Sequence, residues 1–410
     1  MADRFQAPRG TADALPADAA ARARVEQTAR EILERAGYRR IETPVFEDTE
    51  LFARGVGGST DIVRKEMFTF EDKGGRSITL RPEATASIAR AYVEHGMQKL
   101  PQPVKLWWYG PLFRHERPQA GRFRQFSQLD AEVIGSDSPL VDAELIVLLD
   151  ELLRAVEVPE LTLKVSSLGS LESRGAYRNE LIAYLREHED ELDADVRERI
   201  DENPLRAFDS KDPGTQRVMA EAPKMLDHLV GEDAEHFETV KRLLDQAGIA
   251  YEVDATIVRG LDYYTRTVFE FHSTGLGAQS QVAGGGRYDE LIALFGGPRT
   301  PAIGWAAGVE RILLAIESDG EELPHDVFVA ADEAHREQAL ALVTELRRAG
   351  LRADLDLASR SMKGQMRQAD RTGAARTVIL EGDDVRIRDM GSGEQREVDA
   401  GRVVEELTSG

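Results

Sequence analysis

The chain has 410 residues, a length that favours two or three domains over a single core. It contains no cysteine, which excludes disulfide bonds and thiolate metal sites. No apolar run approaches the roughly 20 residues that are needed to span a bilayer. Residues 1–16 lack an apolar signal core, so we expect a cytoplasmic protein that does not associate with membranes.

The net charge of −22 argues against a polyanionic partner, but two stretches of sequence are basic. Residues 347–376 carry eight Arg or Lys residues against three Asp residues, and residues 105–124 carry five against one Glu. Either stretch alone is equally well explained as a solvated surface. The acidic, arginine-rich remainder fits either a high-salt cytoplasm or a GC-rich genome, and the sequence does not separate these two origins.

The hydrophobic pattern of the N-terminal part predicts a long helix followed by short strands. A helical period runs through about 17–36 and ends at Gly37, a residue type typical of helix C-termini. Residues 38–46 predict a short strand whose proline places it at a sheet edge or a strand end. A further strand turns into a helix after Pro82.

Two apolar stretches in the next segment predict an antiparallel hairpin with a basic tip. They cover 104–117 and 123–135. A helix at 139–157 and a strand at 161–169 follow. The segment of about 170–247 is charged and mostly helical, and its position between strands predicts a helical insertion.

Strand signals resume at 251–271, pass through a glycine-rich stretch and end in a strand-to-helix transition at 302–316. After an acidic hinge at 317–325 the hydrophobic pattern changes, and predicted strands alternate with predicted helices to the end of the chain. This alternation predicts a compact α/β domain with its own sheet. We therefore expect one domain over 1–325, which includes the insertion, and a second over 326–410.

The hairpin tip concentrates arginines beside phenylalanines, and the chain has neither a Walker A nor a Rossmann glycine pattern. Arginine forks match pairs of phosphate oxygens, and an aromatic face can stack on a purine. These residue types indicate a nucleotide site, with an exposed, solvated turn as the alternative. The residues are Arg114, Arg117, Arg122, Phe123, Arg124 and Phe126.

Acidic and amide side chains provide candidates for a second site. Glu83 and Thr85 follow Pro82 and could bind an ammonium group, or the acid could simply favour a helix N-terminus. Gln128 and Glu132 are four residues apart on a strand and therefore share a face. A carboxylate buried on that face needs a partner, whereas surface exposure is the alternative.

Three stretches near the end of this domain add to these candidates. The stretch 257–273 places Arg259 and two tyrosines at the head of an apolar alternating run. The glycines at 284–286 let a backbone approach a ligand closely or form a plain turn. Glu310 and Arg311 open a helix of core residues, where an arginine is unusual unless it reaches into a cleft.

The order of these motifs resembles the class II aminoacyl-tRNA synthetases, and their details are similar to the histidyl-tRNA synthetase family. "GYRRIETPVFEDTELFARG" resembles motif 1, "FRHERPQAGRFRQF" resembles motif 2 and "GVERILLAI" resembles motif 3. "RGLDYYTRTVFEF" is close to diagnostic for the histidine branch, and the tail from Ser359 is similar to the family's anticodon-binding domain. The likeness covers essentially the whole chain.

The resemblance implies an α+β catalytic domain, with an antiparallel sheet flanked by helices and a helical insertion near the tRNA acceptor stem, plus a C-terminal α/β anticodon-binding domain. It implies a homodimer formed through motif 1. The implied enzyme ligates L-histidine to tRNA(His) through a histidyl-adenylate, with ATP as a substrate. Mg²⁺ would accompany ATP, held mainly by phosphates and a few carboxylates or waters, and no dedicated metal-ligand set is expected in the chain.

The resemblance also implies a role for each matching residue. Arg259 and Arg114 would be catalytic, because a fixed cation beside the α-phosphate stabilises the charge that develops in the transition state. Glu132 and Tyr264 would read the imidazole nitrogens, since leaving buried polar groups unpaired rejects analogues. ATP would be bound by Arg114, Glu116, Arg122, Phe126 and Arg311, and histidine by Glu83, Ala84, Thr85, Gln128, Glu132, Tyr263, Tyr264 and Tyr288.

The chain departs from the family pattern at two positions. Ala84 stands where the family usually has Gly, which would alter the approach of the backbone to the amino acid. Ser127 replaces a common histidine, which would remove an imidazole beside the pocket, so no residue is assigned the general-base role in transfer.

Three other functions compete with this interpretation. The first is a histidine-sensing regulatory paralogue of the ATP phosphoribosyltransferase complex, against which the retained Arg259, Arg114 and Arg311 argue. The second is a class II-like ligase that adenylates a small molecule without tRNA, against which the C-terminal domain argues. The third is an acidic nucleotide-binding protein without ligase activity, against which the "RGLDYYT" stretch argues.

Overall fold

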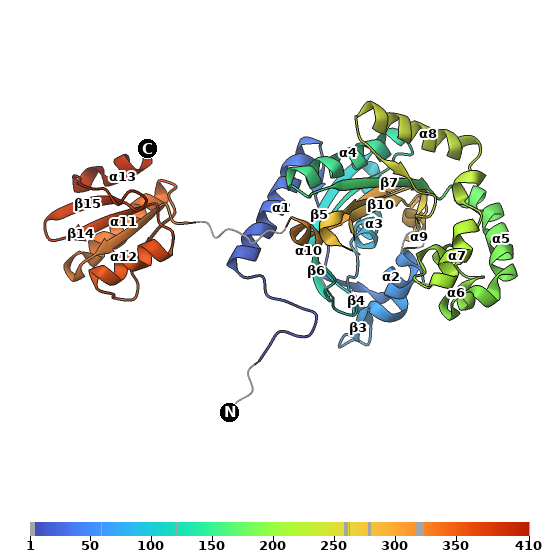
Figure 1. Cartoon of the computed structure of the whole chain (residues 1–410), viewed down its shortest axis with the longest axis horizontal. Coiled ribbons are helices and arrows are strands. Elements are labelled where there is room, and N and C mark those ends of the chain that lie inside the picture. Colours follow the sequence, from blue (N-terminus) through green and yellow to red (C-terminus); the bar gives the residue numbers. More distant parts are fainter. Residues whose placement is uncertain are drawn as a thin grey trace. The chain divides into compact units, whose positions relative to one another are not determined.

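A computed structural model of the chain describes residues 5–58, 60–119, 121–257, 261, 263–277, 280–316 and 324–409. The chain divides into two compact units, Met1–Gly320 and Glu321–Gly410 (Figure 1). Over the described ranges, no helix combines the length and the apolar character that crossing a membrane requires.

The first unit is built on one eight-stranded sheet in the order β1-β5-β6-β11-β10-β9-β7-β8. Its inner pairs are antiparallel, and only the short edge strands β1 and β8 pair in parallel. Flanking helices complete the predicted architecture, which is confirmed. In sheet order the strands are Arg39–Arg40, Val104–Phe113, Gln125–Ile134, Ala302–Gly308, Gln281–Arg287, Thr265–Ser273, Leu161–Ser167 and Glu252–Val253.

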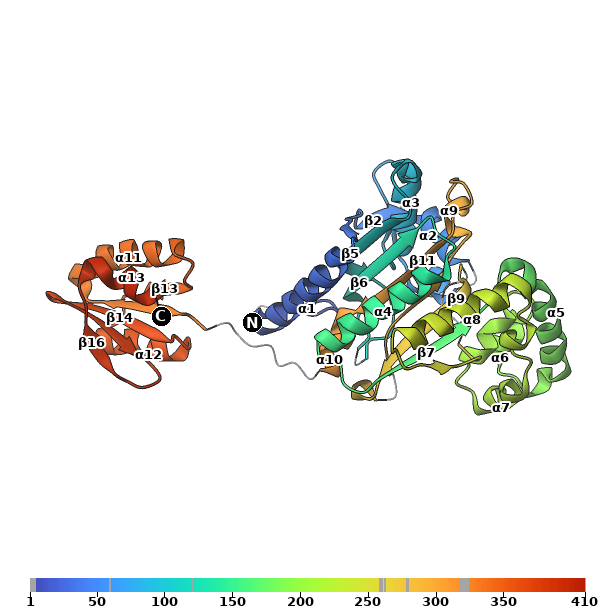
Figure 2. The ribbon, with the colours of Figure 1, turned by 90° about the horizontal axis from the view of Figure 1, so that it is seen from above.

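Helices cover both faces of this sheet because its inner strands alternate apolar side chains on the two sides. On one face α1 (Pro16–Arg35), α4 (Pro139–Ala155) and α8 (Gly231–Gln246) close the largest core (Figure 2). On the other face α3 (Thr85–Glu94) and α9 (Leu291–Leu294) cover part of the sheet. The uncovered part of that second face holds the site described below.

A small sheet lies beside α3, in the order β2-β4-β3. Its strands are β2 (Phe46–Asp48), β4 (Ser77–Leu80) and β3 (Phe68–Glu71), and α2 (Thr49–Val56) follows β2 directly. The predicted strand at 38–46 is therefore split: β1 pairs at the edge of the large sheet, and the chain enters the small sheet after Pro44.

The predicted helical insertion is helical, but its parts pack differently. Helices α5 (Leu171–Glu187), α6 (Ala194–Arg199) and α7 (Pro213–Glu221) enclose their own apolar cluster. The last helix, α8, instead packs against α4 and contributes Phe237 and Leu244 to the core of the large sheet. The separate helical body thus ends before α8.

The second unit has a five-stranded sheet in the order β13-β12-β14-β15-β16. Helices α11 (Arg336–Arg348) and α13 (Val403–Thr408) pack on one face, and α12 (Met362–Arg371) packs on the other. The predicted alternation of strands and helices is confirmed. The strands are Ala353–Leu355, Val327–Ala331, Arg376–Glu381, Asp384–Asp389 and Gln395–Glu397.

Two local expectations are corrected. The strand expected over 251–271 consists of β8 and β9, and β9 begins only at Thr265, after the two tyrosines. The glycines at 284–286 form the interior of β10 and not a turn. A Cβ at Gly285 would lie 2.1 Å from the Gly304 carbonyl oxygen, so close strand packing requires glycine there.

Candidate active site

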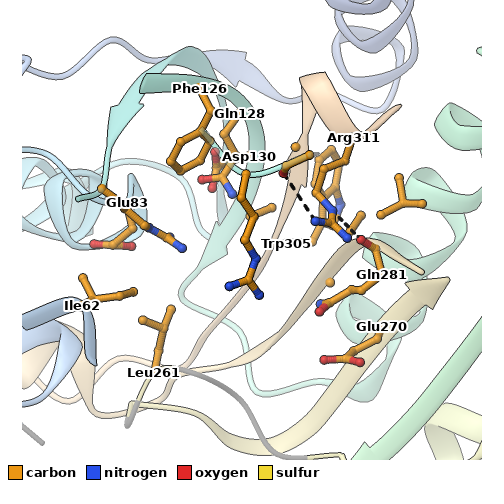
Figure 3. A pocket seen from close by; sticks show the side chains of 18 of the residues that line it. Ile62, Glu83, Phe126, Gln128, Asp130, Leu261, Glu270, Gln281, Trp305 and Arg311 are labelled. Carbon is orange, nitrogen blue, oxygen red and sulfur yellow. Dashed lines mark hydrogen bonds between the residues drawn. The ribbon is translucent and has the colours of Figure 1, made fainter. Parts of the chain in front are cut away.

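A cavity of about 650 Å³ opens on the uncovered face of the large sheet (Figure 3). Glu132 lies beneath its floor, Ala84 packs in the core behind it, and Arg259 lies outside the described residues. The structure brings together the other predicted residues in its lining: Glu83, Thr85, Arg114, Glu116, Arg122, Phe126, Gln128, Tyr263, Tyr264, Tyr288 and Arg311.

Glu132 is 1% exposed and is held by two hydroxyl groups. Thr85 Oγ1, at the start of α3, donates to Oε1 at 2.7 Å, and the Tyr288 hydroxyl donates to Oε2 at 2.5 Å. Burial raises the pKa of Glu132 to about 8 despite these two donors. The expected surface alternative is excluded, and the two donors leave the carboxyl group with lone pairs that could accept a further N–H.

Glu83 and Asp130 place two more carboxyl groups around the same floor (Figure 3). Glu83 accepts the Ala86 N–H at 2.8 Å, and burial raises its pKa to about 7. Asp130 is 1% exposed, and its Oδ2 has no hydrogen-bond partner within the described part of the chain. Burial and the neighbouring Glu132 raise the pKa of Asp130 well above its usual range.

Three buried carboxyl groups around one floor favour a ligand that carries positive charge or several N–H donors. Asp130 was missed in the sequence, although a signal was present. Strand side chains alternate, so a residue midway between Gln128 and Glu132 must share their face.

Tyrosines form the wall between this floor and the insertion. The Tyr263 ring lies 4.8 Å from the Tyr264 ring and 5.6 Å from the Tyr288 ring, centroid to centroid. Burial raises the pKa of Tyr263 and Tyr288 well above the usual value, so both hydroxyls stay protonated as donors. A flat heteroaromatic ring fits such a wall, since aromatic pairs prefer tilted or offset contacts at these separations.

Arginines converge on the opposite part of the cavity. Arg114 donates from Nε to the Pro82 carbonyl at 2.8 Å, and its guanidinium lies 5.4 Å from the Phe126 ring centroid. Arg122 pairs with Glu116 at 3.2 Å. The solvated-turn alternative therefore does not describe Arg114 and Phe126, which are half-buried in the cavity lining, whereas Arg122 lines the cavity but stays exposed.

Arg311 enters this part of the cavity from α10 (Val309–Ala315). Its Nε donates to the Gln281 carbonyl at 2.7 Å, which aims the guanidinium across β10 (Figure 3). Burial, reinforced by Arg122, lowers the pKa of Arg311. Two cations held close together attract a polyanion such as a polyphosphate.

Ser127, where the family commonly has histidine, does not itself line the cavity, but it contacts Glu310, which does. Its hydroxyl accepts from Arg22 Nη1 at 3.2 Å, and its N–H donates to both Glu310 carboxylate oxygens at 2.9 Å. Arg22 also pairs with Glu310 at 2.9 Å. Ser127 thus belongs to a set of contacts that joins α1, β6 and α10 and that includes one cavity-lining residue, Glu310.

Residues 10–312 match the family model described as histidyl-tRNA synthetase, and residues 323–409 match the anticodon binding domain. The histidine–tRNA ligase of Thermosynechococcus vestitus is 47% identical over 95% of this chain and 93% of its own length. That of Rubrobacter xylanophilus is 48% identical over 97% of each chain. The apo crystal structure of the S. aureus histidyl-tRNA synthetase is 36% identical, covers 99% of this chain and 100% of its own, and superposes with a TM-score of 0.84. These similarities confirm the prediction from the motifs: the chain belongs to the histidyl-tRNA synthetase family.

Proposed function

We propose that the enzyme activates L-histidine with ATP and then transfers the histidyl group to tRNA(His). The observation that carries this proposal is Glu132, buried between Thr85 and Tyr288 beneath a cavity whose opposite part is lined by arginines. An acceptor for imidazole N–H groups and a polyphosphate site would thus serve one space, as the first reaction step requires.

Histidine would bind at the acidic floor. Glu83, Thr85 and Gln128 would contact the α-ammonium group, since they line the cavity beside Arg114. Glu132 and Tyr264 would contact the two imidazole nitrogens, and the remaining tyrosines would enclose the ring. A buried acceptor that is left unpaired by a wrong substrate gives strong discrimination.

ATP would bind at the arginines. Phe126 would stack on adenine with Glu116 near its amino group, and Arg122 and Arg311 would hold the distal phosphates. Arg114 would hold the α-phosphate together with Arg259. No cluster of three or more carboxylate or imidazole groups suited to a metal occurs in the described ranges, so Mg²⁺ would arrive with ATP, bound mainly by phosphates and water.

The chemistry consists of two displacements. A histidine carboxylate oxygen attacks the α-phosphorus of ATP, the bond to the bridging oxygen breaks, and pyrophosphate leaves with histidyl-adenylate retained. A terminal ribose hydroxyl of the tRNA then attacks the carbonyl carbon, the bond from that carbon to the phosphate oxygen breaks, and AMP leaves while the hydroxyl proton passes to its phosphate or to water. Both steps build negative charge beside Arg114 and Arg259, which fixed cations stabilise.

The second unit would bind the anticodon arm. Lys363, Arg367 and Arg371 are exposed on α12 at intervals of four residues, so they form one basic face. Phosphate contacts by such residues supply affinity that falls with salt. Catalysis would therefore reside in 1–325 and anticodon binding in 326–410, in the cytoplasm where tRNA is charged.

A second copy of the chain would cover the small sheet, giving the homodimer expected from motif 1. Val45, Phe46 and Phe70 are exposed on or beside its outer strands. Neighbouring exposed apolar side chains of this size favour a protein contact. Sedimentation equilibrium of the purified protein tests the dimer directly.

ATP–pyrophosphate exchange, measured with histidine and each other standard amino acid at low and at molar KCl, tests the function. Exchange with histidine alone is expected. The regulatory paralogue is not favoured, because the curated relatives are ligases over nearly their full length. A folded protein that exchanges with no amino acid would contradict the proposal and revive that alternative.

A further inference from the structure

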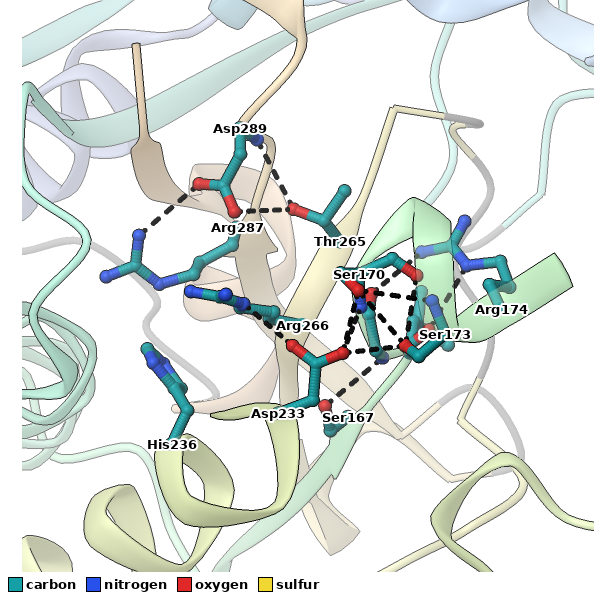
Figure 4. Close-up of polar contacts among 12 residues, drawn as sticks. Ser167, Ser170, Ser173, Arg174, Asp233, His236, Thr265, Arg266, Arg287 and Asp289 are labelled. Atoms are coloured by element: carbon teal, nitrogen blue, oxygen red, sulfur yellow. Dashed lines mark hydrogen bonds and ion pairs between the residues drawn. The ribbon is translucent and has the colours of Figure 1, made fainter. Parts of the chain in front are cut away.

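The two ends of the helical insertion meet on one carboxylate, that of Asp233 (Figure 4). Asp233 is 6% exposed in the first turn of α8 and accepts from Ser170 N, Ser170 Oγ and Ser173 Oγ at 2.6–2.9 Å. It also accepts from Arg266 Nε of β9 at 2.9 Å. Burial alone would raise its pKa, but these donors lower it to about 2, so the group is charged at physiological pH.

Arg266 lies at an irregularity of β9 with a φ of +44°, a conformation that non-glycine residues adopt only when their surroundings enforce it. Its N–H donates to the Gly169 carbonyl at 2.8 Å, and its carbonyl accepts from Leu168 N at 2.7 Å. Both the side chain and the backbone of Arg266 are thus bonded to the root of the insertion, by which we mean Leu168, Gly169 and Asp233. The start of β9 has its position set by the segment that begins the insertion.

Arg174, on the first turns of α5, extends this tie to the tyrosine wall. Its Nη2 donates to the Tyr264 carbonyl at 2.6 Å, and its Nε donates to the Leu168 carbonyl at 3.1 Å. Tyr264 in turn packs on Tyr263. Arg174 has no place among the predicted site residues and does not line the cavity.

We infer that Arg174 is a positioning residue for histidine recognition, which holds the Tyr264 backbone, and with it the tyrosine wall, at a place set by the helical insertion. The inference rests on the proposed function. It also has a consequence for tRNA, because Arg206 and Lys211 of the insertion line the same cavity. If the tRNA acceptor stem displaces the insertion, the displacement would change the position of the tyrosine wall through the contacts of Arg174.

The test uses Arg174→Ala and Arg174→Lys in the full-length enzyme, assayed by histidine-dependent ATP–pyrophosphate exchange. For Arg174→Ala we expect the KM for histidine to rise about tenfold or more, the scale of losing a charged hydrogen bond, and the KM for ATP to stay within about twofold. The KM for histidine of Arg174→Lys should lie between the values of wild type and Arg174→Ala, because an ammonium group cannot make both of the contacts that the guanidinium makes.

The matched control is Arg178→Ala, one turn further along α5. Arg178 is likewise half-buried and donates to backbone carbonyls, but at Asp201 and Glu202, inside the insertion. Its removal should leave both KM values unchanged. If Arg174→Ala folds poorly, the lysine variant still gives the comparison, and its KM for histidine should exceed that of wild type.

Two results would overturn the inference while leaving the proposed function intact. One is an unchanged KM for histidine in both Arg174 variants, and the other is an equal rise in both KM values, which would indicate general loosening of the fold. Failure of the wild-type enzyme to exchange with histidine would instead overturn the proposed function, so the two failures are distinguishable.

Discussion

The hydroxyl of Tyr288 donates a 2.5 Å hydrogen bond to Glu132 across the floor of the cavity. Tyr288 follows β10 and Glu132 lies on β6, so the contact spans β11, which separates these strands in the sheet. Both residues are at most 2% exposed. The pair is preorganised, because neither side chain can turn to solvent when the cavity is empty, and a ligand therefore meets an acceptor of fixed direction.

Replacing Glu132 with Gln keeps the shape of this side chain and removes one of its two acceptor oxygens. We expect the KM for histidine to rise about 10- to 100-fold, the range for leaving a buried hydrogen-bonding group without its partner, with the KM for ATP changed less than about threefold. Pyrophosphate exchange at saturating concentrations of the other substrate measures both values. Equal losses for histidine and ATP would assign Glu132 a structural role instead.

The raised pKa values of Glu83 and Glu132 predict how the stability of the ligand-free enzyme depends on pH. Between the ordinary glutamate value of about 4.5 and the folded values of about 7 and 8, the unfolded chain has lost protons that the folded chain retains. The contribution of these two groups to the free energy of unfolding should therefore be largest below this window, fall as the pH rises through it, and level off above pH 8.

The Glu132→Gln variant separates the contribution of Glu132 to this pH dependence from that of Glu83. The variant should match wild type in thermal unfolding midpoint near pH 4.5 and exceed it near pH 8.5, because the glutamine never ionises. Calorimetry of both ligand-free proteins at the two pH values makes the comparison. The same offset at both values would show that the substitution acts through packing and not through ionisation.

Much of the fold followed from sequence because its elements are long and strongly patterned. The 17–36 helix, the hairpin strands and the 302–316 transition each carry enough apolar residues to specify both type and position. Boundaries failed where tertiary contacts decide them. The strand expected across 251–271 starts only at Thr265, and the next residue, Arg266, has a positive φ and pairs with Asp233, a residue 33 positions earlier in the chain.

The candidate site was predicted chiefly through family resemblance. Periodicity by itself placed Gln128 and Glu132 on one face of the strand, but it did not identify Asp130 as a site residue. A carboxyl group that lies between two polar side chains on a strand face is usually exposed to solvent. The role of Arg174 had no signal at all, as a helical arginine in a charged segment is ordinary. Its contact depends on how the insertion folds back on β9.

Gly304 provides a steric test of the histidine floor. It pairs with Glu132 across β11 and β6, and a Cβ there would lie 1.5 Å from Glu132 Oε2 and 2.8 Å from the Ala131 carbonyl oxygen. Gly304→Ala should displace the carboxyl group, raise the KM for histidine at least about tenfold and lower stability by about 1–3 kcal/mol. Exchange kinetics and thermal unfolding measure the two effects.

Gly175→Ala is the matched control for this substitution. Gly175 lies in α5, and a Cβ there meets no atom within 4 Å. The change should leave both KM values unaltered and stabilise the enzyme by about 0.5–1 kcal/mol, since glycine is unfavourable inside a helix. If the Gly304→Ala enzyme were as active as this control, the strands or the Glu132 side chain would be able to move aside for the added Cβ without a loss of histidine binding.

Arg259 lies outside the described residues, so its role is predicted from the motif alone. Arg259→Ala should reduce the rate of histidyl-adenylate formation at least about 100-fold, as expected when a transition-state contact is lost. Single-turnover assays with saturating histidine and ATP measure that rate. A nearly unchanged rate in a folded variant would remove Arg259 from the mechanism.

The basic face of α12 predicts a salt-dependent contribution to tRNA binding and none to amino-acid activation. Replacing Lys363, Arg367 and Arg371 together with Gln should lower kcat/KM for tRNA charging about tenfold or more near 150 mM salt while leaving pyrophosphate exchange intact. The slope of log affinity against log salt should flatten by about two to three, because each lost phosphate contact removes about one released counterion.

Arg402→Gln is the control for this triple substitution. Arg402 is also exposed in the second unit, but it pairs with Glu405 and lies next to α13, away from the α12 face. Its loss should change neither charging nor the salt slope. If the triple variant kept the wild-type slope, the face would not contact phosphates, and the local excess of positive charge in an acidic protein would be a solvated surface after all.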